Sequence, residues 1–179
     1  EYYSVYQEWM AALPTLGIKI LRNGSDVLTK DGASLVVGGT TDLGASRFGE
    51  EAPNVEKTFS GTSPEDFRIL LAHQPKTGSL TKEKFDLQLS GHTHGGHIFF
   101  MYPLLAYFND GLVSGFYDRG EKKVYVTNGS GLWNGFTMRV DLPRPRVAKR
   151  FIVIDLPTEA SATTSASTSR LWLFSALAM

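Results

Sequence analysis

The sequence has no cysteine among its 179 residues. Disulfide bonds, thiolate metal ligands and a cysteine nucleophile are therefore excluded for this chain. Any metal ion that it binds must be held by nitrogen and oxygen ligands. The sequence also has no run of about 18 apolar residues, the length that a membrane-spanning helix needs. Membrane association by other means stays open, although nothing in the sequence supports it.

An excess of either charge is missing as well, because Lys plus Arg and Asp plus Glu both number 18. A balanced chain without a basic block lacks the electrostatic footprint of a nucleic-acid-binding protein, so we expect no large nucleic-acid surface. The composition is 42% hydrophobic and 20% charged, as in ordinary globular proteins, and predicts one domain with a hydrophobic core.

The first part of the chain predicts a helix, short strands and a long loop. Apolar residues recur at helical spacing over residues 4–13. Apolar segments then alternate with Asn23-Gly24 and Asp31-Gly32, which are strong hairpin-turn signals. We therefore expect an antiparallel meander with strands at 18–21, 26–29 and 35–37. Residues 40–66 lack periodicity and predict a long loop with one helical turn at most.

The later segments predict a strand–helix–strand unit. Short apolar runs at residues 67–72 and 85–90 flank a stretch with helix-forming content at 77–84. Each of these two strands ends in a histidine-bearing loop. Further strands are expected at 124–127 and 150–154. The whole pattern indicates a sheet-rich α/β domain.

The composition changes at residue 157. Residues 158–169 are almost entirely Ser, Thr and Ala, and they offer too few large apolar groups to offset the entropy of ordering. The last residues, 171–179, are apolar but too few to span a membrane. We therefore divide the chain into a domain portion, 1–156, and a disordered tail with a short apolar end, 157–179.

All four histidines lie within 25 residues of one another. Imidazole is a common metal ligand, and a His-x-His pair can present two rings on the same side of an extended segment. His92 and His94 have this spacing. A lone histidine is more often a hydrogen-bonded structural residue, but the clustering favours His73, His92 and His94 as metal ligands.

Glycines surround the histidine pair. Gly91, Gly95 and Gly96 allow backbone conformations that other residues avoid, and they would leave room for a metal ion or a phosphate to approach. His97 follows these glycines and has no spacing argument of its own, so contact with a substrate and plain packing are equally open for it.

Aromatic residues accompany the histidine cluster. They could line a substrate groove or contact lipid, but packing in the core is the favoured interpretation. These residues are Phe99, Phe100, Tyr102, Tyr107, Phe108 and Trp133.

Two segments of the chain resemble the late motifs of calcineurin-like metallophosphoesterases. They are Leu70-Leu71-Ala72-His73-Gln74-Pro75 and Leu89-Ser90-Gly91-His92-Thr93-His94-Gly95-Gly96. Gly-His-Thr-His-Gly-Gly after an apolar strand is specific to few families. The resemblance extends from Glu1 to about residue 156, and it implies the C-terminal part of a four-layer α-β-β-α sandwich.

The resemblance also implies a chemistry. His73 and His92 would bind one divalent metal ion and His94 a second one, the metals being Mn, Fe or Zn. The expected reaction is hydrolysis of a phosphomonoester or phosphodiester, with a lipid head group among the substrates that stay open. His97 would contact the substrate, although such relatives usually have Gln at this position and Arg near Asn128, so the substrate preference is expected to differ.

The family's earlier motifs, which supply carboxylate and asparagine ligands, are absent from the chain. Glu1-Tyr2-Tyr3-Ser4 resembles the end of the family's Gly-Asn-His-Glu motif and the residues just after it. We therefore expect an upstream segment whose last histidine would be oriented by Glu1, and we expect the chain alone to be inactive.

Two alternatives to a two-metal hydrolase stay open. The chain could be a non-catalytic fragment or degenerate relative that retains a metal-binding loop. It could also be a single-zinc hydrolase in which His73, His92 and His94 share one ion and leave a fourth position open.

Overall fold

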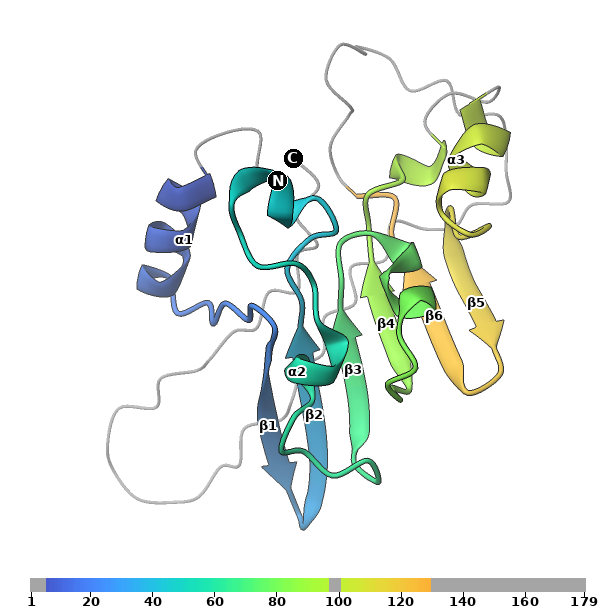
Figure 1. Ribbon diagram of the computed structural model, residues 1–179. Helices are drawn as coiled ribbons and strands as arrows, with labels where there is room; N and C mark the ends of the chain where they lie inside the picture. Colours follow the sequence, from blue (N-terminus) through green and yellow to red (C-terminus); the bar gives the residue numbers. More distant parts are fainter. Residues whose placement is uncertain (1–5, 97–100, 130–179) are drawn as a thin grey trace.

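A six-stranded mixed sheet organises the residues that the computed structural model describes, 6–96 and 101–129 (Figure 1). The strand order is β1-β2-β3-β4-β6-β5. The strands are β1 (Gly24–Lys30), β2 (Ala33–Gly39), β3 (Phe67–Leu71), β4 (Leu87–Ser90), β5 (Gly115–Arg119) and β6 (Lys122–Val126). The four inner strands are parallel, and β1 and β5 are antiparallel edge strands. The predicted α/β class is confirmed.

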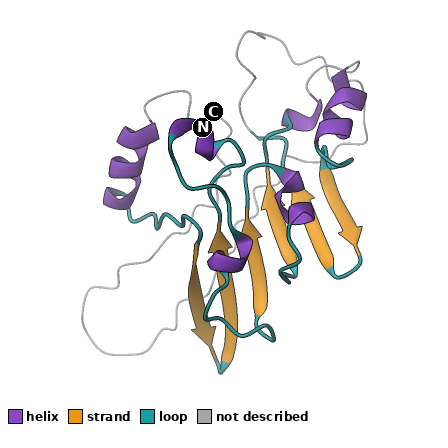
Figure 2. Cartoon of the chain, in the orientation of Figure 1, coloured by secondary structure: helices purple, strands orange, loops and turns teal. Residues whose placement is uncertain are grey.

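Short helices connect the strands (Figure 2). The α-helices are α1 (Tyr6–Thr15), α2 (Val55–Thr58) and α3 (Tyr102–Phe108), and the 3₁₀ helices are η1 (Ala45–Phe48), η2 (Pro75–Leu80) and η3 (His94–Gly96). Among the helices of the described residues, none has the length and apolar content needed to cross a membrane.

Two tight turns build the edge hairpins. Asp31 and Gly32 have φ angles of 50° and 78°, and they join β1 to β2 where Lys30 pairs with Ala33. A two-residue turn with both residues left-handed matches the twist of the flanking strands. The hairpin predicted at this turn is confirmed. A similar turn that contains Gly120, with φ 78°, joins β5 to β6.

The strand expected at residues 18–21 is wrong, and so is the hairpin at Asn23-Gly24. Residues 18–21 have no regular structure. Leu21 packs across Gly39 at the end of β2, where a Cβ on Gly39 would lie 2.6 Å from the Leu21 Cβ. Asn23, with φ 49°, turns the chain, but its buried side chain bonds to the loop that follows β2. The segment therefore packs against β2 instead of adding a strand.

Other expectations differ from the structure in their bounds. The helix expected at 4–13 is α1, which includes Pro14, and the loop expected at 40–66 holds η1 and α2. The helix-forming stretch 77–84 is helical only in η2. The carbonyls of Gly78 and Thr81 accept hydrogen bonds from Nζ of Lys122, at 3.2 and 2.7 Å. Since Lys122 is the first residue of β6, these carbonyls bond to the sheet and not within a longer helix.

Two elements, α3 and β5, were not predicted at all. The strand expected at 150–154 and the tail 157–179 lie outside the described residues.

One face of the sheet is covered by α2 and η2 (Figures 1 and 2). The backbone of β2 approaches α2 closely, because a Cβ on Gly38 would lie 2.6 Å from Thr58 and 2.7 Å from Phe59. The buried cluster on this face consists of Val36, Val55, Phe59, Leu70, Ala72 and Phe85. A second cluster, nearer β5, consists of Leu112, Val124 and Val126 with Tyr117 packed against it.

The opposite face of the inner strands is also apolar. Since side chains alternate along a strand, the residues between those of the first core point the other way. They lie side by side on three strands, and they are Leu35, Val37, Phe67, Ile69, Leu71, Leu87 and Leu89. The sheet therefore has apolar side chains on both faces, as inner strands of a layered α/β protein do.

Candidate metal centre

The candidate ligands lie where parallel strands end at the same edge of the sheet. His73 follows β3 and His92 follows β4, and Figure 1 shows these ends beside each other. The backbone pairing continues past the strands, because Gly91 N–H donates to the His73 carbonyl at 3.0 Å. Loops at the carboxyl edge of parallel strands are common ligand sites. The topology therefore brings these two histidines together.

The two rings meet through their nitrogens. Nδ1 of His92 lies 3.2 Å from Nε2 of His73, and the rings are nearly perpendicular, at 78°. This contact is a hydrogen bond when one ring nitrogen carries a proton and the other does not. Both side chains are partly exposed.

The same pair fits a metal ion. Two nitrogens 3.2 Å apart, each at a typical His–metal distance of about 2.1 Å, would subtend an angle of about 100° at the ion. That angle lies near the tetrahedral value, and both donors are the imidazoles that Zn, Fe and Mn accept. The donor pair of His73 and His92 is therefore compatible with one shared divalent ion.

The backbone at the histidine pair is left-handed. His92 and His94 have φ angles of 71° and 49°. Thr93 N–H donates to the Gly91 carbonyl at 2.8 Å, which makes His92 the centre of a γ-turn of the rare kind with positive φ. The buried side chain of Thr93 stabilises the turn, because its hydroxyl donates a hydrogen bond to the Val113 carbonyl. A γ-turn of this kind is strained, and strained residues cluster at functional sites.

The space beside the glycines is taken by protein side chains. A Cβ on Gly95 would lie 2.7 Å from the Asn128 side chain, and one on Gly96 would lie 2.8 Å from Tyr102. Both glycines also have positive φ, 68° and 83°. The expected backbone conformations are confirmed for Gly95 and Gly96, and the absence of their side chains makes room for Asn128 and Tyr102.

One carboxylate comes close to the histidine loops. Asp42, three residues beyond β2, accepts hydrogen bonds from Gln74 Nε2 at 3.1 and 3.3 Å and from Gly44 N–H at 2.7 Å. Gln74 is the residue after His73, so Asp42 braces the loop that carries this histidine. The sequence analysis did not propose Asp42, although an aspartate shortly after an apolar strand is a signal that could have identified it.

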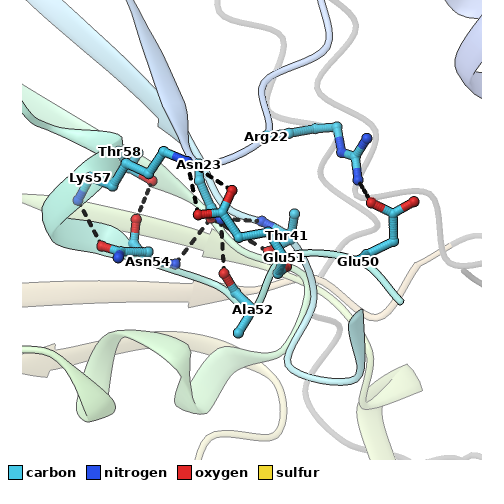
Figure 3. A network of polar contacts seen from close by, with 9 residues as sticks. All are labelled: Arg22, Asn23, Thr41, Glu50, Glu51, Ala52, Asn54, Lys57 and Thr58. Atoms are coloured by element: carbon cyan, nitrogen blue, oxygen red, sulfur yellow. Dashed lines mark hydrogen bonds and ion pairs between the residues drawn. The ribbon is translucent and has the colours of Figure 1, made fainter. Parts of the chain in front are cut away.

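A polar network fixes the loop that carries Asp42 (Figure 3). Asn23 Nδ2 donates to the Ala52 carbonyl at 2.8 Å, and Asn23 Oδ1 accepts from Asn54 N–H at 3.0 Å and from Thr41 N–H at 3.3 Å. At its outer edge, the Lys57 ammonium holds the pKa of Glu51 below its usual range. The network ties both ends of the loop to the start of β1.

The same loop also contacts α1, a helix in which no residue is buried. The hydroxyl of Tyr6 donates to Glu50 at 2.7 Å, and the Arg22 guanidinium forms an ion pair with the same carboxylate. These two partners, the hydroxyl first, lower the pKa of Glu50.

Of the other residues that the sequence analysis proposed for the site, His94 alone lies among the described residues. His94 lies in η3, and no three His, Asp or Glu side chains of residues 6–96 and 101–129 are placed to hold one ion together. Glu1 and His97 lie outside the described residues. The structure thus brings the side chains of His73 and His92 into contact.

Comparison with known proteins gives several relatives. The chain is 44% identical over 110 residues to an uncharacterised metallophosphoesterase of Campylobacter jejuni, covering 60% of this chain and 29% of that protein. It is 35% identical over 146 residues to one of Helicobacter pylori, covering 80% of this chain and 38% of the relative. Phosphodiesterase YaeI of Escherichia coli is 30% identical over 139 residues, which cover 75% of this chain and 47% of YaeI.

The chain thus spans less than half the length of each of these curated relatives. No family model matches it, and no solved structure does.

Proposed function

Because this chain belongs to the metallophosphoesterases, with 30–44% identity over most of its length, we propose that it carries the histidine ligands of a two-metal site that hydrolyses phosphoesters. The observation that supports this most directly is the approach of His73 Nε2 to His92 Nδ1. Hydrolysis adds water across one P–O bond, the hydroxyl going to phosphorus and the proton to the departing oxygen.

His73 and His92 would hold one divalent ion, and His94 would hold the second. Such ions, Mn, Fe or Zn, neutralise charge on the phosphoryl oxygens and supply a nucleophile from water at neutral pH. Glu1 would orient an upstream histidine, as the resemblance implies, and His97 would contact the substrate.

The chain's own residues position the ligands. Asp42 holds Gln74 and with it the turn that bears His73. The hydrogen bond from Gly91 to the His73 carbonyl fixes the separation of the two loops. Ligand orientation by such neighbours raises metal affinity, so Asp42 and Gln74 are positioning residues of the proposed site.

The four-layer sandwich and the domain portion 1–156 remain part of this proposal. The partly exposed leucines of the apolar face support it, since a second sheet packed there would bury them further. They are Leu35, Leu71, Leu87 and Leu89. The carboxylate ligands expected upstream would then come from that second sheet.

The experiment uses the full-length protein with bis-p-nitrophenyl phosphate and added Mn, Zn or Fe. A diester is chosen because the relative YaeI is named a phosphodiesterase. Variants His73→Ala, His92→Ala and His94→Ala are compared with Leu80→Ala, which changes an exposed side chain at the end of η2. We expect metal-dependent turnover to fall at least about hundredfold in the histidine variants, since loss of a supporting group alone costs about 10–100-fold.

Metal content separates the alternatives. The proposal requires that His73→Ala and His92→Ala reduce the same equivalent of metal and His94→Ala the other. A wild-type protein that binds metal without turnover would instead be a binding module. One tightly bound equivalent, weakened in all three variants, would indicate the three-histidine site, which the described residues do not support.

A further inference from the structure

The outer face of α3 is apolar, contrary to the usual arrangement of a surface helix. Leu104, Tyr107 and Phe108 follow the i, i+3, i+4 spacing that places side chains on one face of a helix. Their exposed fractions are 49%, 81% and 56%. An apolar stripe of this spacing normally faces the core. Core packing, the favoured interpretation of the sequence, is therefore wrong for Tyr107 and Phe108.

The inner side of α3 is held by the protein. Tyr102 packs on Gly96 of η3, and Asn109, which follows the last residue of the helix, is buried. The orientation of the helix is thus fixed by contacts on its other side.

Charge is missing from this region of the chain. No Asp, Glu, Lys or Arg occurs from residue 87 to residue 109, a stretch that includes the histidine pair and all of α3. A surface exposed to water normally carries such residues, and an apolar surface without them indicates a binding face. Leu, Tyr and Phe are also the side chains that enter the boundary between lipid head groups and acyl chains.

The patch is too small for a stable protein partner by itself. An aromatic side chain buries about 150–250 Å², so the exposed parts of Leu104, Tyr107 and Phe108 amount to about 400 Å². A stable protein interface needs about 800 Å² on each partner. Insertion into a lipid layer has no such minimum, because any buried apolar area contributes.

The patch lies beside the candidate metal centre. Figure 1 shows α3 beyond the carboxyl ends of β4 and β6, and the contact between Tyr102 and Gly96 joins it to the loop of His92 and His94. A lipid whose acyl chains contact α3 would therefore bring its phosphoester to the same edge of the sheet as the histidines.

We propose that Leu104, Tyr107 and Phe108 insert into the acyl-chain boundary of a phospholipid layer, and that the substrate is a phosphoester in a lipid head group. The second part rests on the proposed phosphoesterase function, whereas the first does not.

The test uses the full-length protein and sucrose-loaded vesicles of phosphatidylcholine and phosphatidylglycerol in equal amounts. The double variant Tyr107→Ser/Phe108→Ser removes both aromatic rings of the patch, and Leu80→Ser, at 69% exposure on the last residue of η2, is the control. Co-sedimentation measures binding to the vesicles. Turnover is measured with soluble bis-p-nitrophenyl phosphate and with the vesicle phospholipids.

We expect the partition of the double variant into vesicles to fall at least about tenfold, since each lost large apolar side chain weakens burial substantially. Leu80→Ser should bind as the wild type does. Turnover of the soluble diester should be equal in all three proteins, and turnover of the vesicle lipid should fall only in the double variant.

Equal vesicle binding by the wild type and the double variant would overturn the proposal. So would a change of oligomeric state in the double variant, measured by light scattering, without vesicle binding by the wild type, because the patch would then join copies of the chain. If no substrate is hydrolysed, the phosphoesterase proposal and the lipid substrate fail, while co-sedimentation still tests the lipid contact of α3.

Discussion

Gln74 donates to both carboxylate oxygens of Asp42, at 3.1 and 3.3 Å, and so links the loop after β2 to the loop after β3. The link joins residues far apart in the chain and lies next to His73. The Asp42 carboxylate therefore does not contact His73 through this bond. It holds Gln74, the residue next to His73.

Replacing Asp42 with Ala should weaken metal binding. Without the carboxylate, Gln74 and the turn that bears His73 lose their fixed orientation, and the metal dissociation constant should rise about 10–100-fold. Titration with Mn or Zn followed by calorimetry measures this. Asp26→Ala is the control, because Asp26 pairs with Lys19 away from the histidine loops. Unchanged affinity in Asp42→Ala would remove Asp42 from the site.

Replacing Gly95 with Ala should destabilise the protein by about 1–3 kcal/mol more than replacing Gly49. Both glycines are left-handed, with φ 68° and 75°, so the backbone strain is similar. Only Gly95 has a neighbour where the new methyl group would lie, the Asn128 side chain, whereas Gly49 has nothing within 4 Å. Urea unfolding gives both values. Equal losses in the two variants would show that Asn128 moves away at no cost.

Replacing Arg68 with Ala should cost about 3–5 kcal/mol, because it leaves buried acceptors and a cavity. The Arg68 side chain is 4% exposed, pairs with Glu83 at 2.8 Å, and donates to the Thr62 carbonyl at 3.0 Å. Its guanidinium also lies over the Phe59 ring. Lys57→Ala removes an exposed ion pair and should cost less than about 1 kcal/mol. Chemical denaturation compares them, and similar small losses would contradict this account.

Lowering the pH should weaken the contact between α1 and the loop that carries Glu50. The pKa of Glu50 is lowered by the Tyr6 hydroxyl and by Arg22. A lowered pKa means that the contact stabilises the folded state above the ordinary pKa of a glutamate, and that this contribution is lost as the pH falls through the lowered value. Amide exchange in α1, corrected for its intrinsic pH dependence, should rise over that range. Glu50→Gln should show the faster exchange already at neutral pH, and a pH response that persists in this variant would contradict the assignment.

The sequence was sufficient for the elements whose signal is local. The runs that became β3 and β4 combine apolar residues with polar ends, and the Asp31-Gly32 turn needs only two left-handed residues. The convergence of His73 and His92 followed from both strands ending in histidine loops, once the strands proved parallel neighbours.

Features that depend on contacts between distant segments could not be predicted from the sequence. Residues 18–21 form an apolar run like a strand, but Leu21 packs over Gly39, and no local pattern indicates this. The residue types in α3 show an apolar stripe, but the side of the helix that faces the protein depends on Tyr102 and Gly96. Asp42 likewise gained its place only through Gln74.

The strand order of the sheet also sets an order of assembly. The β1–β2 and β5–β6 pairs are joined by two-residue turns, and such hairpins form within about 1–10 μs. Each parallel pairing must instead close a long connection, and nonlocal contacts of this kind slow folding. The edge hairpins should therefore form early. Among the parallel pairings, β3–β4 closes the shortest connection, residues 72–86, so the histidine loops should meet before the sheet is complete.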